Sequence, residues 1–246
     1  MDDQTGLMVP SARRSASHVG HRERLRARAR AGGLGAIPDY ELLELFLFRS
    51  IPQRDVKPLA KALLDRFGSL SGVLAAEDQA LRRVSAPDAR GRALSVGADT
   101  ALDLQLLQEA ALRLGRESIG GRSVISSWSA LLSYVRVALA HEPREQFRVL
   151  FLDKKNQLII DETMNQGTVD HAPVYPREIM RRALELSSSA VILVHNHPSG
   201  DPTPSPADID MTRRVIEAGR SLNVSVHDHL VVGRQGVVSF KSLGLI

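Results

Sequence analysis

The 246-residue sequence predicts an α+β protein, with a small helical domain followed by a mixed α/β domain. Three observations lead to this prediction. Helical patterns occupy most of the first 115 or so residues. From about residue 122, short apolar runs typical of strands alternate with helical stretches. Between them, residues 115–123 (GRESIGGRS) are polar and rich in glycine, and we interpret them as a linker.

In the front part, apolar residues at helical spacing predict helices that begin near a capping residue and end near a glycine. The expected helices are 38–48, 55–67, 78–84 and 99–114. A turn and a short apolar piece separate the second from the third at 69–76. Residues 86–97 contain proline, glycine and arginine, and we expect a loop there.

In the second part, helices and strands interleave. The expected helices are 129–140, 176–186 and 206–222, and the expected strands are 147–152, 157–161, 191–195 and 224–232. The first two strands are joined by the turn 153–156. The sequence therefore divides into a basic flexible arm (1–36), a helical domain (37–115) and an α/β domain (122–246).

The net charge of +4 is concentrated in the arm. Residues 11–36 contain seven arginines and one glutamate, so this segment carries +6 and the rest of the chain −2. A basic segment of this kind suits an anionic partner such as nucleic acid, and the alternative is a solvated, partly disordered leader.

The chain has no cysteine, which excludes disulfides and thiolate metal ligands. Any metal must therefore be held by His, Asp or Glu. No segment approaches the roughly 18 consecutive apolar residues of a membrane span. We expect a cytoplasmic protein.

The stretch 195–210, HNHPSGDPTPSPADID, holds the strongest functional signal. It follows a buried strand, and side chains two residues apart on a strand point to the same side, with Cα atoms roughly 6.6 Å apart. His195 and His197 therefore present two imidazoles to one point, while Asn196 turns away. Ser205 is placed to cap the next helix and Pro206 to begin it, which directs Asp208 back toward the strand end.

Two imidazoles and one carboxylate leave a tetrahedral zinc ion one open position for water, as in catalytic zinc sites. Such a site makes hydroxide available near neutral pH. The alternatives are surface histidines beside an ordinary helix start, an iron site with two His and one carboxylate, and a binuclear phosphoesterase, which needs further His and Asp residues close by.

His-x-His-Pro, six residues and then Ser-x-x-Asp resembles the JAMM (MPN+) metallopeptidase signature, and its extended form resembles the RadC family. Supporting stretches are Gly167-Thr168, Pro176-Arg-Glu-Ile179 and the closing strand from Asp228 to Gly233. The front part is similar to RadC proteins through 41–45 (ELLEL) and through Leu64 and Phe67-Gly68. This resemblance implies a JAMM/MPN-like fold, related to cytidine deaminases, with a curved mixed sheet flanked by helices.

The resemblance also implies one Zn²⁺ per chain, held by His195, His197 and Asp208. It places a general base at Glu145, with Glu142 and Glu178 as competitors. It gives Ser205 the task of steadying an oxyanion, through a hydroxyl proton that stays free while the oxygen caps the helix.

Three other histidines and one turn complete these expectations. His227 and His229 are expected on one face of the last long strand, and we expect a structural role for His229 with orientation of a metal ligand as the alternative. His171 carries no signal. RadC proteins usually have a Gly-hydrophobic-Gly turn like that of a helix-hairpin-helix unit, and residues 85–91 lack its glycine pair, so the unit is degenerate here.

Two functions from different classes follow. The first is a zinc-dependent hydrolase of amide bonds, a metallopeptidase or isopeptidase acting on a peptide or isopeptide substrate. The second is a DNA-repair or recombination accessory, in which the JAMM domain is a binding platform and the arginine-rich arm contacts nucleic acid.

Overall fold

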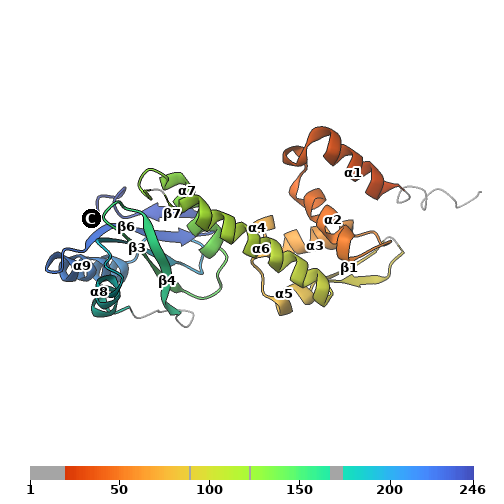
Figure 1. The fold of residues 1–246 in the computed structure, drawn as a ribbon. Helices are drawn as coiled ribbons and strands as arrows, with labels where there is room; N and C mark the ends of the chain where they lie inside the picture. The colour runs from red at the N-terminus through yellow and green to blue at the C-terminus, as the bar shows by residue number, and fades with distance from the viewer. Residues whose placement is uncertain (1–19, 89, 122, 167–173) are drawn as a thin grey trace, which may run out of the picture. The chain divides into compact units, whose positions relative to one another are not determined.

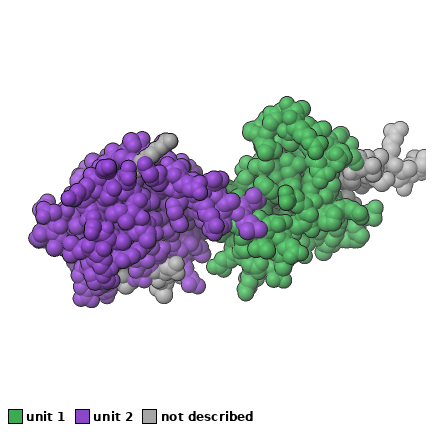
Figure 2. All heavy atoms as spheres, viewed as in Figure 1, with its two compact units in different colours: residues 1–105 green, residues 106–246 purple. Residues whose placement is uncertain are grey.

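The computed structural model describes residues 20–88, 90–121, 123–166 and 174–246. Residues 1–19 of the expected arm, Gly167-Thr168 and His171 lie outside this range. The chain forms two compact units, which divide between residues 105 and 106 (Figure 2). The sequence placed the division at 115–122 instead. Each unit is described on its own.

Unit 1 is helical, and its helices pack around one apolar core. Its elements are α1 (His21–Gly32), η1 (Leu34–Ala36), α2 (Asp39–Ser50), α3 (Lys57–Phe67), α4 (Leu70–Leu74), α5 (Asp78–Arg82), β1 (Ser85–Pro87), β2 (Ala93–Ser95) and the start of α6 (Ala98–Ile119). Glycine ends α3 as expected, because Gly68 takes a left-handed conformation with φ of 79°. Ser69 then caps α4 by accepting a hydrogen bond from the Gly72 amide.

The expectation that residues up to 36 form a flexible arm is wrong for residues 21–32, which form α1. Leu25 is buried in the core of unit 1. Arg22 donates to the carbonyl oxygens of Phe48, Ile51 and Arg54 at 2.6–3.2 Å. These backbone acceptors lie at and beyond the end of α2, so the Arg22 guanidinium holds α1 in place.

Two buried carboxylates of α2 also hold α1. Glu44 accepts a hydrogen bond from the His21 ring at 2.8 Å, and Glu41 pairs with Arg28. Buried carboxylates need such partners because an isolated buried charge is costly. The glutamates of the stretch 41–45 therefore have structural contacts in unit 1.

The expected loop at 86–97 contains a short antiparallel pair, β1 with β2. The turn between them is built on Asp88, whose carboxylate accepts from the amides of Arg90 and Arg92 and from the guanidinium of Arg54. These bonds hold the pKa of Asp88 well below its ordinary value, although burial opposes the shift. Aspartate side chains that accept from nearby amides stabilise turns.

The expected linker at 115–123 is wrong in its first part, because α6 continues through Gly115 to Ile119. Gly115 is needed for packing. A Cβ there would lie 3.2 Å from the ring of Tyr134. The glycine thus lets α6 and the Tyr134 ring approach closely, so its presence in the sequence did not mark a break in the helix.

Unit 2 is a mixed sheet covered by helices on both faces (Figure 1). The strand order is β4-β3-β5-β6-β7, in which β5 and β6 are parallel and the other neighbours are antiparallel. Beyond the C-terminal part of α6, the elements are α7 (Trp128–Leu139), β3 (Gln146–Leu152), β4 (Leu158–Gln166), α8 (Pro176–Glu185), β5 (Ala190–Asn196), α9 (Pro206–Arg220), β6 (Ser225–Gly233) and β7 (Gly236–Ser239).

The two faces of β5 pack against different helices. Ile192 and Val194 belong to the core that α7 closes, whereas Val191 and Leu193 belong to the core that α8 and α9 close. Every residue of β5 is buried, as expected for a central strand with both faces covered. The alternation along β5 therefore decides which helix each side chain meets.

The α+β fold class and the order of elements in unit 2 agree with the sequence prediction. The sequence missed β7, whose four residues are too few for a periodic signal, and it ended β4 five residues early. Among the described residues, no helix has both the length and the apolar character that a membrane crossing requires.

A substitution at Gly219, near the end of α9, tests the close packing of this helix in unit 2. A Cβ on Gly219 would lie 2.3 Å from the carbonyl oxygen of Val224, so we expect Gly219→Ala to lower the stability of unit 2 by about 1–3 kcal/mol. Trp128, the only tryptophan of the chain, lies in unit 2 and reports its unfolding by fluorescence. Gly120→Ala is the control, because its Cβ would make only ordinary contacts. Equal unfolding midpoints for the two variants would contradict the prediction.

Candidate metal centre

The end of β5 presents side chains to both faces of the sheet. His195 follows Val191 and Leu193 on the face covered by α9, and its ring stacks against Phe147 of β3 with ring centres 6.1 Å apart. Asn196 points to the other side. His197 comes directly after the strand and keeps a sheet-like contact, because its amide donates to Val232 of β6 at 2.9 Å.

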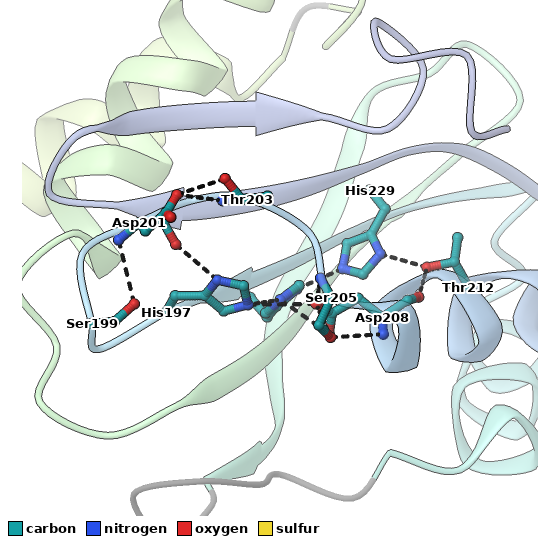
Figure 3. A network of polar contacts seen from close by, with 9 residues as sticks. His197, Ser199, Asp201, Thr203, Ser205, Asp208, Thr212 and His229 are labelled. Atoms are coloured by element: carbon teal, nitrogen blue, oxygen red, sulfur yellow. Dashed lines mark hydrogen bonds and ion pairs between the residues drawn. The ribbon is translucent and has the colours of Figure 1, made fainter.

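Asp208 is positioned by the start of α9. Ser205 caps the helix by accepting from the Asp208 amide at 3.2 Å, and the Ser205 amide donates to Asp208 Oδ2 at 2.7 Å. This reciprocal arrangement is a capping box, with Pro206 in the first turn. The bonds that begin the helix therefore also orient the carboxylate toward the end of β5 (Figure 3).

The structure brings the three expected ligand side chains together. Donor atoms of His195, His197 and Asp208 lie within 4.8 Å of one another. The two Nε2 atoms are 3.0 Å apart, and Asp208 oxygens lie 3.4 Å from His195 Nε2 and 3.5 Å from His197 Nε2. Zinc bonds of about 2.0 Å at tetrahedral angles separate donor atoms by about 3.3 Å, so these residues fit a zinc ion.

The turn formed by residues 198–201 contacts the end of β6 and holds His197 in place. The His197 Nδ1 atom lies 2.9 Å from the carbonyl oxygen of Asp201. Because a carbonyl only accepts, His197 donates from Nδ1 and keeps Nε2 for the metal centre. Arg234 donates to the carbonyl oxygens of Pro198 and Ser199, and Gly233 lies under the turn at Gly200.

His195 is held from the other side by buried neighbours. Its Nδ1 lies 2.7 Å from Nε2 of His229, and Nδ1 of His229 lies 2.6 Å from Oγ1 of Thr212 in α9. The Thr212 hydroxyl in turn donates to the carbonyl oxygen of Asp208 at 2.6 Å. Figure 3 shows His229 between the metal centre and Thr212.

The expectation that His227 and His229 share one face is wrong. The pairing of β5 with β6 has an irregularity in which Val226 and Asp228 oppose consecutive residues of β5, so His227 is an extra residue. This breaks the alternation, and His227 contacts Asn156 at 2.6 Å instead. A structural role alone does not describe His229 either, because its ring contacts the ring of His195, a candidate metal ligand.

The electrostatics of the centre favour an anionic Asp208 and a protonated His197. Burial alone would raise the pKa of Asp208, but the neighbouring imidazoles of His195 and His197 and the hydrogen bond from Ser205 outweigh it and hold the pKa well below its ordinary value. The same contact with Asp208 raises the pKa of His197. A cation bound by His197 Nε2 takes the place of this proton.

Asn196 ties the segment that carries Glu145 to the end of β5. Its Oδ1 accepts from the amide of Gln146 at 2.8 Å, and its Nδ2 donates to the carbonyl oxygens of Glu142 and Arg144 at 3.2 and 3.1 Å. The side chain is buried and all three bonds are to the backbone. The residue between the two histidines thus sets the position of the segment before β3.

Glu145 is half-buried in this segment, and its negative charge contributes to the raised pKa of His197. The competing glutamates have other contacts. The Glu142 carboxylate accepts from Gln146 Nε2 at 2.6 Å, and Glu178 forms ion pairs with Arg177 and Arg181 on α8. The charge of Glu145 thus acts on a side chain of the metal centre.

The expectation of a free Ser205 hydroxyl proton is wrong. Besides accepting from the Asp208 amide, the Ser205 hydroxyl donates to Asp208 Oδ2 at 2.7 Å. The carboxylate is the strongest acceptor within reach, so the proton goes there. Donation to a reacting oxygen requires the hydroxyl to turn away from Asp208.

Two contributing residues were missed from the sequence, and each had a signal. Thr212 lies four residues after Asp208 in one helix, so the two share a helix face. Asn196 lies on the opposite face of β5 from the histidines, where a buried amide must find polar partners.

A substitution at Gly233 tests the contact between the end of β6 and the turn that orients His197. A Cβ there would lie 2.3 Å from the carbonyl oxygen of Gly200 and 3.0 Å from the nitrogen of Pro202. We expect Gly233→Ala to displace the turn and with it the carbonyl that orients His197, and so to weaken zinc binding about 10-fold or more. Competition with a chromophoric chelator measures this, with Gly120→Ala as the control. Wild-type affinity in Gly233→Ala would contradict the role given to the turn.

Comparison with known proteins agrees with this geometry. Residues 125–245 match the family model described as the RadC-like JAB domain. The match covers α7, the whole mixed sheet, α8 and α9, and it includes the three candidate ligands. It confirms the resemblance to the RadC family for the second part of the chain, and the fold class predicted from the sequence. Through this domain the chain belongs to the RadC family.

Proposed function

We propose that this protein is a zinc-dependent hydrolase of amide bonds, of the metallopeptidase or isopeptidase type. The observation that carries the proposal is the clustering of two imidazole nitrogens and one carboxylate next to a buried strand end, where each pair of these groups has atoms 3.0–3.5 Å apart. The family match supports it because the matched domain is of the JAB type.

The chemistry of the donor set also supports zinc. The centre offers two imidazole nitrogens and one carboxylate, and zinc is commonly held by this combination in hydrolases. Bound zinc supplies Lewis acidity, which lowers the pKa of a coordinated water to about 7. The side chains of His197 and Asp208 are 20 % and 15 % exposed, so a substrate can approach the centre.

In the proposed reaction, Glu145 is the general base. It takes a proton from water as the water oxygen bonds to the amide carbon, and it delivers that proton to the nitrogen as the carbon–nitrogen bond breaks. The Ser205 hydroxyl turns from Asp208 and donates a hydrogen bond to the carbonyl oxygen as negative charge develops there. Asn196 keeps the backbone on both sides of Glu145 in place.

Metal analysis tests the centre directly. We expect the purified wild-type protein to contain about one zinc per chain, and His197→Ala to fall to background because one of three ligands is lost. His227→Ala is the matched control, since His227 lies two residues from His229 but contacts Asn156. Equal and negligible zinc in wild type and His197→Ala would remove the hydrolase proposal.

A second variant tests the base. We expect Glu145→Gln to retain zinc and to lower the rate of amide hydrolysis by about 10²- to 10⁴-fold, because the amide cannot accept the proton. Cleavage of a mixed peptide pool, followed by mass spectrometry, measures the rate. Glu142→Gln is the control, because its carboxylate is bonded to Gln146. Similar losses in both variants would contradict the assignment to Glu145.

A further inference from the structure

We propose that His229 and Thr212 are positioning residues, which hold His195 in the one neutral form that leaves its Nε2 lone pair facing the metal centre. The inference rests on the proposed zinc site and adds two residues to it. It follows from the directions of three consecutive hydrogen bonds, beginning at a backbone carbonyl and ending at a ligand.

The chain of bonds begins at Asp208. Its carbonyl oxygen lies 2.6 Å from Oγ1 of Thr212, and a carbonyl has no proton to give. The single hydroxyl proton of Thr212 must therefore point to Asp208. Toward its other neighbour, 2.6 Å away, Thr212 offers only a lone pair.

The next bond runs from His229 to Thr212. Since Thr212 can only accept on this side, Nδ1 of His229 carries a proton. The ring of His229 is fully buried between Phe147 and Phe240, with ring centres 5.7 and 4.5 Å away. A second proton would place an uncompensated cation among these apolar rings, so Nε2 of His229 keeps a lone pair.

The last bond runs from His195 to His229. Nε2 of His229 accepts, so Nδ1 of His195 donates across the 2.7 Å contact. A neutral imidazole carries one proton, and His195 has placed it on Nδ1. Its Nε2 lone pair is then left facing Nε2 of His197 and the carboxylate of Asp208.

The reversed direction is inconsistent with the geometry. If His195 accepted at Nδ1, neutral His229 would donate from Nε2 and accept at Nδ1, and Thr212 would have to donate to it. The Thr212 oxygen and the Asp208 carbonyl oxygen would then face each other at 2.6 Å without a proton between them. Two lone pairs at that distance repel, so the chain of bonds has one favourable direction.

The two imidazole ligands are thus oriented in different ways. His197 donates directly to a carbonyl of an exposed turn, whereas His195 donates through two buried side chains to the peptide group of Asp208. The buried route links one ligand to the helix turn that carries another. Partners that orient metal-bound histidines are typically worth 10- to 100-fold in metal affinity.

Nitrogen-15 NMR of the histidine rings in the wild-type full chain tests the bond directions without any substitution. In protein prepared free of zinc, at mildly alkaline pH, we expect both His195 and His229 to carry their proton on Nδ1. A ring proton on Nε2 of either residue would overturn the proposal. Because this measurement needs no metal, its outcome is independent of whether the protein binds zinc.

Thr212→Val tests the consequence. Valine keeps the shape but cannot accept from His229, so His229 should move its proton to Nε2 and force the proton of His195 onto the atom that faces the metal. We expect zinc binding, measured with a competing chelator, to weaken about 10- to 100-fold, and the NMR signature of His195 to switch. Thr212→Ser keeps the hydroxyl and should behave like wild type.

The two failures are distinguishable. If wild type binds zinc and Thr212→Val binds it equally well with His195 still protonated on Nδ1, the positioning role is wrong. If wild type binds no zinc, the proposed hydrolase function fails, and the wild-type NMR result still decides the bond directions. If Thr212→Val does not fold, as judged by Trp128 fluorescence, the NMR result alone confirms or rejects the inference.

Discussion

The alternation of side chains along β5 is the constraint on which the metal centre depends. Both faces of this strand are buried, so each residue is committed to one helix layer. Odd-numbered residues face α8 and α9, which places His195 beside the helix that carries Asp208. Even-numbered residues face the other layer, which places Asn196 against the segment that carries Glu145. A shift of one residue in the register of β5 would exchange these environments.

The contacts that stabilise the domain also orient the centre. The capping box at the start of α9 satisfies two amides of the helix end, and the same bonds direct the Asp208 carboxylate. The Ser205 hydroxyl is part of this arrangement, so a role in steadying an oxyanion competes with its bond to Asp208. On the other side of the centre, Gly233 and Arg234 hold the turn that contains the acceptor of His197.

The charge distribution predicted an anionic partner for the arginines near the N-terminus, but some of these arginines form contacts within the helical unit. Arg22 and Arg28 of α1 contact backbone carbonyls and a buried glutamate of the same unit. The Asp88 carboxylate accepts hydrogen bonds from backbone amides of the turn between β1 and β2. Nucleic-acid binding by the arginine-rich segment therefore stays a prediction from composition, and the family match, which begins at residue 125, concerns the other unit.

The sequence by itself determined the fold class, the elements of the second unit except β7, and the three candidate ligands. It could do so because strand alternation and helix capping are local rules, and His195, His197 and Asp208 lie within fourteen residues. Glu145 came from the family resemblance. Tertiary structure decided the features that depend on residues far apart in the sequence. The irregularity at His227 depends on the pairing of β6 with β5. The need for glycine at position 115 depends on the ring of Tyr134, nineteen residues away. Tertiary structure also decided the chain of bonds from His195 through His229 to Thr212, because hydrogen bonds between buried groups are set by which elements pack together.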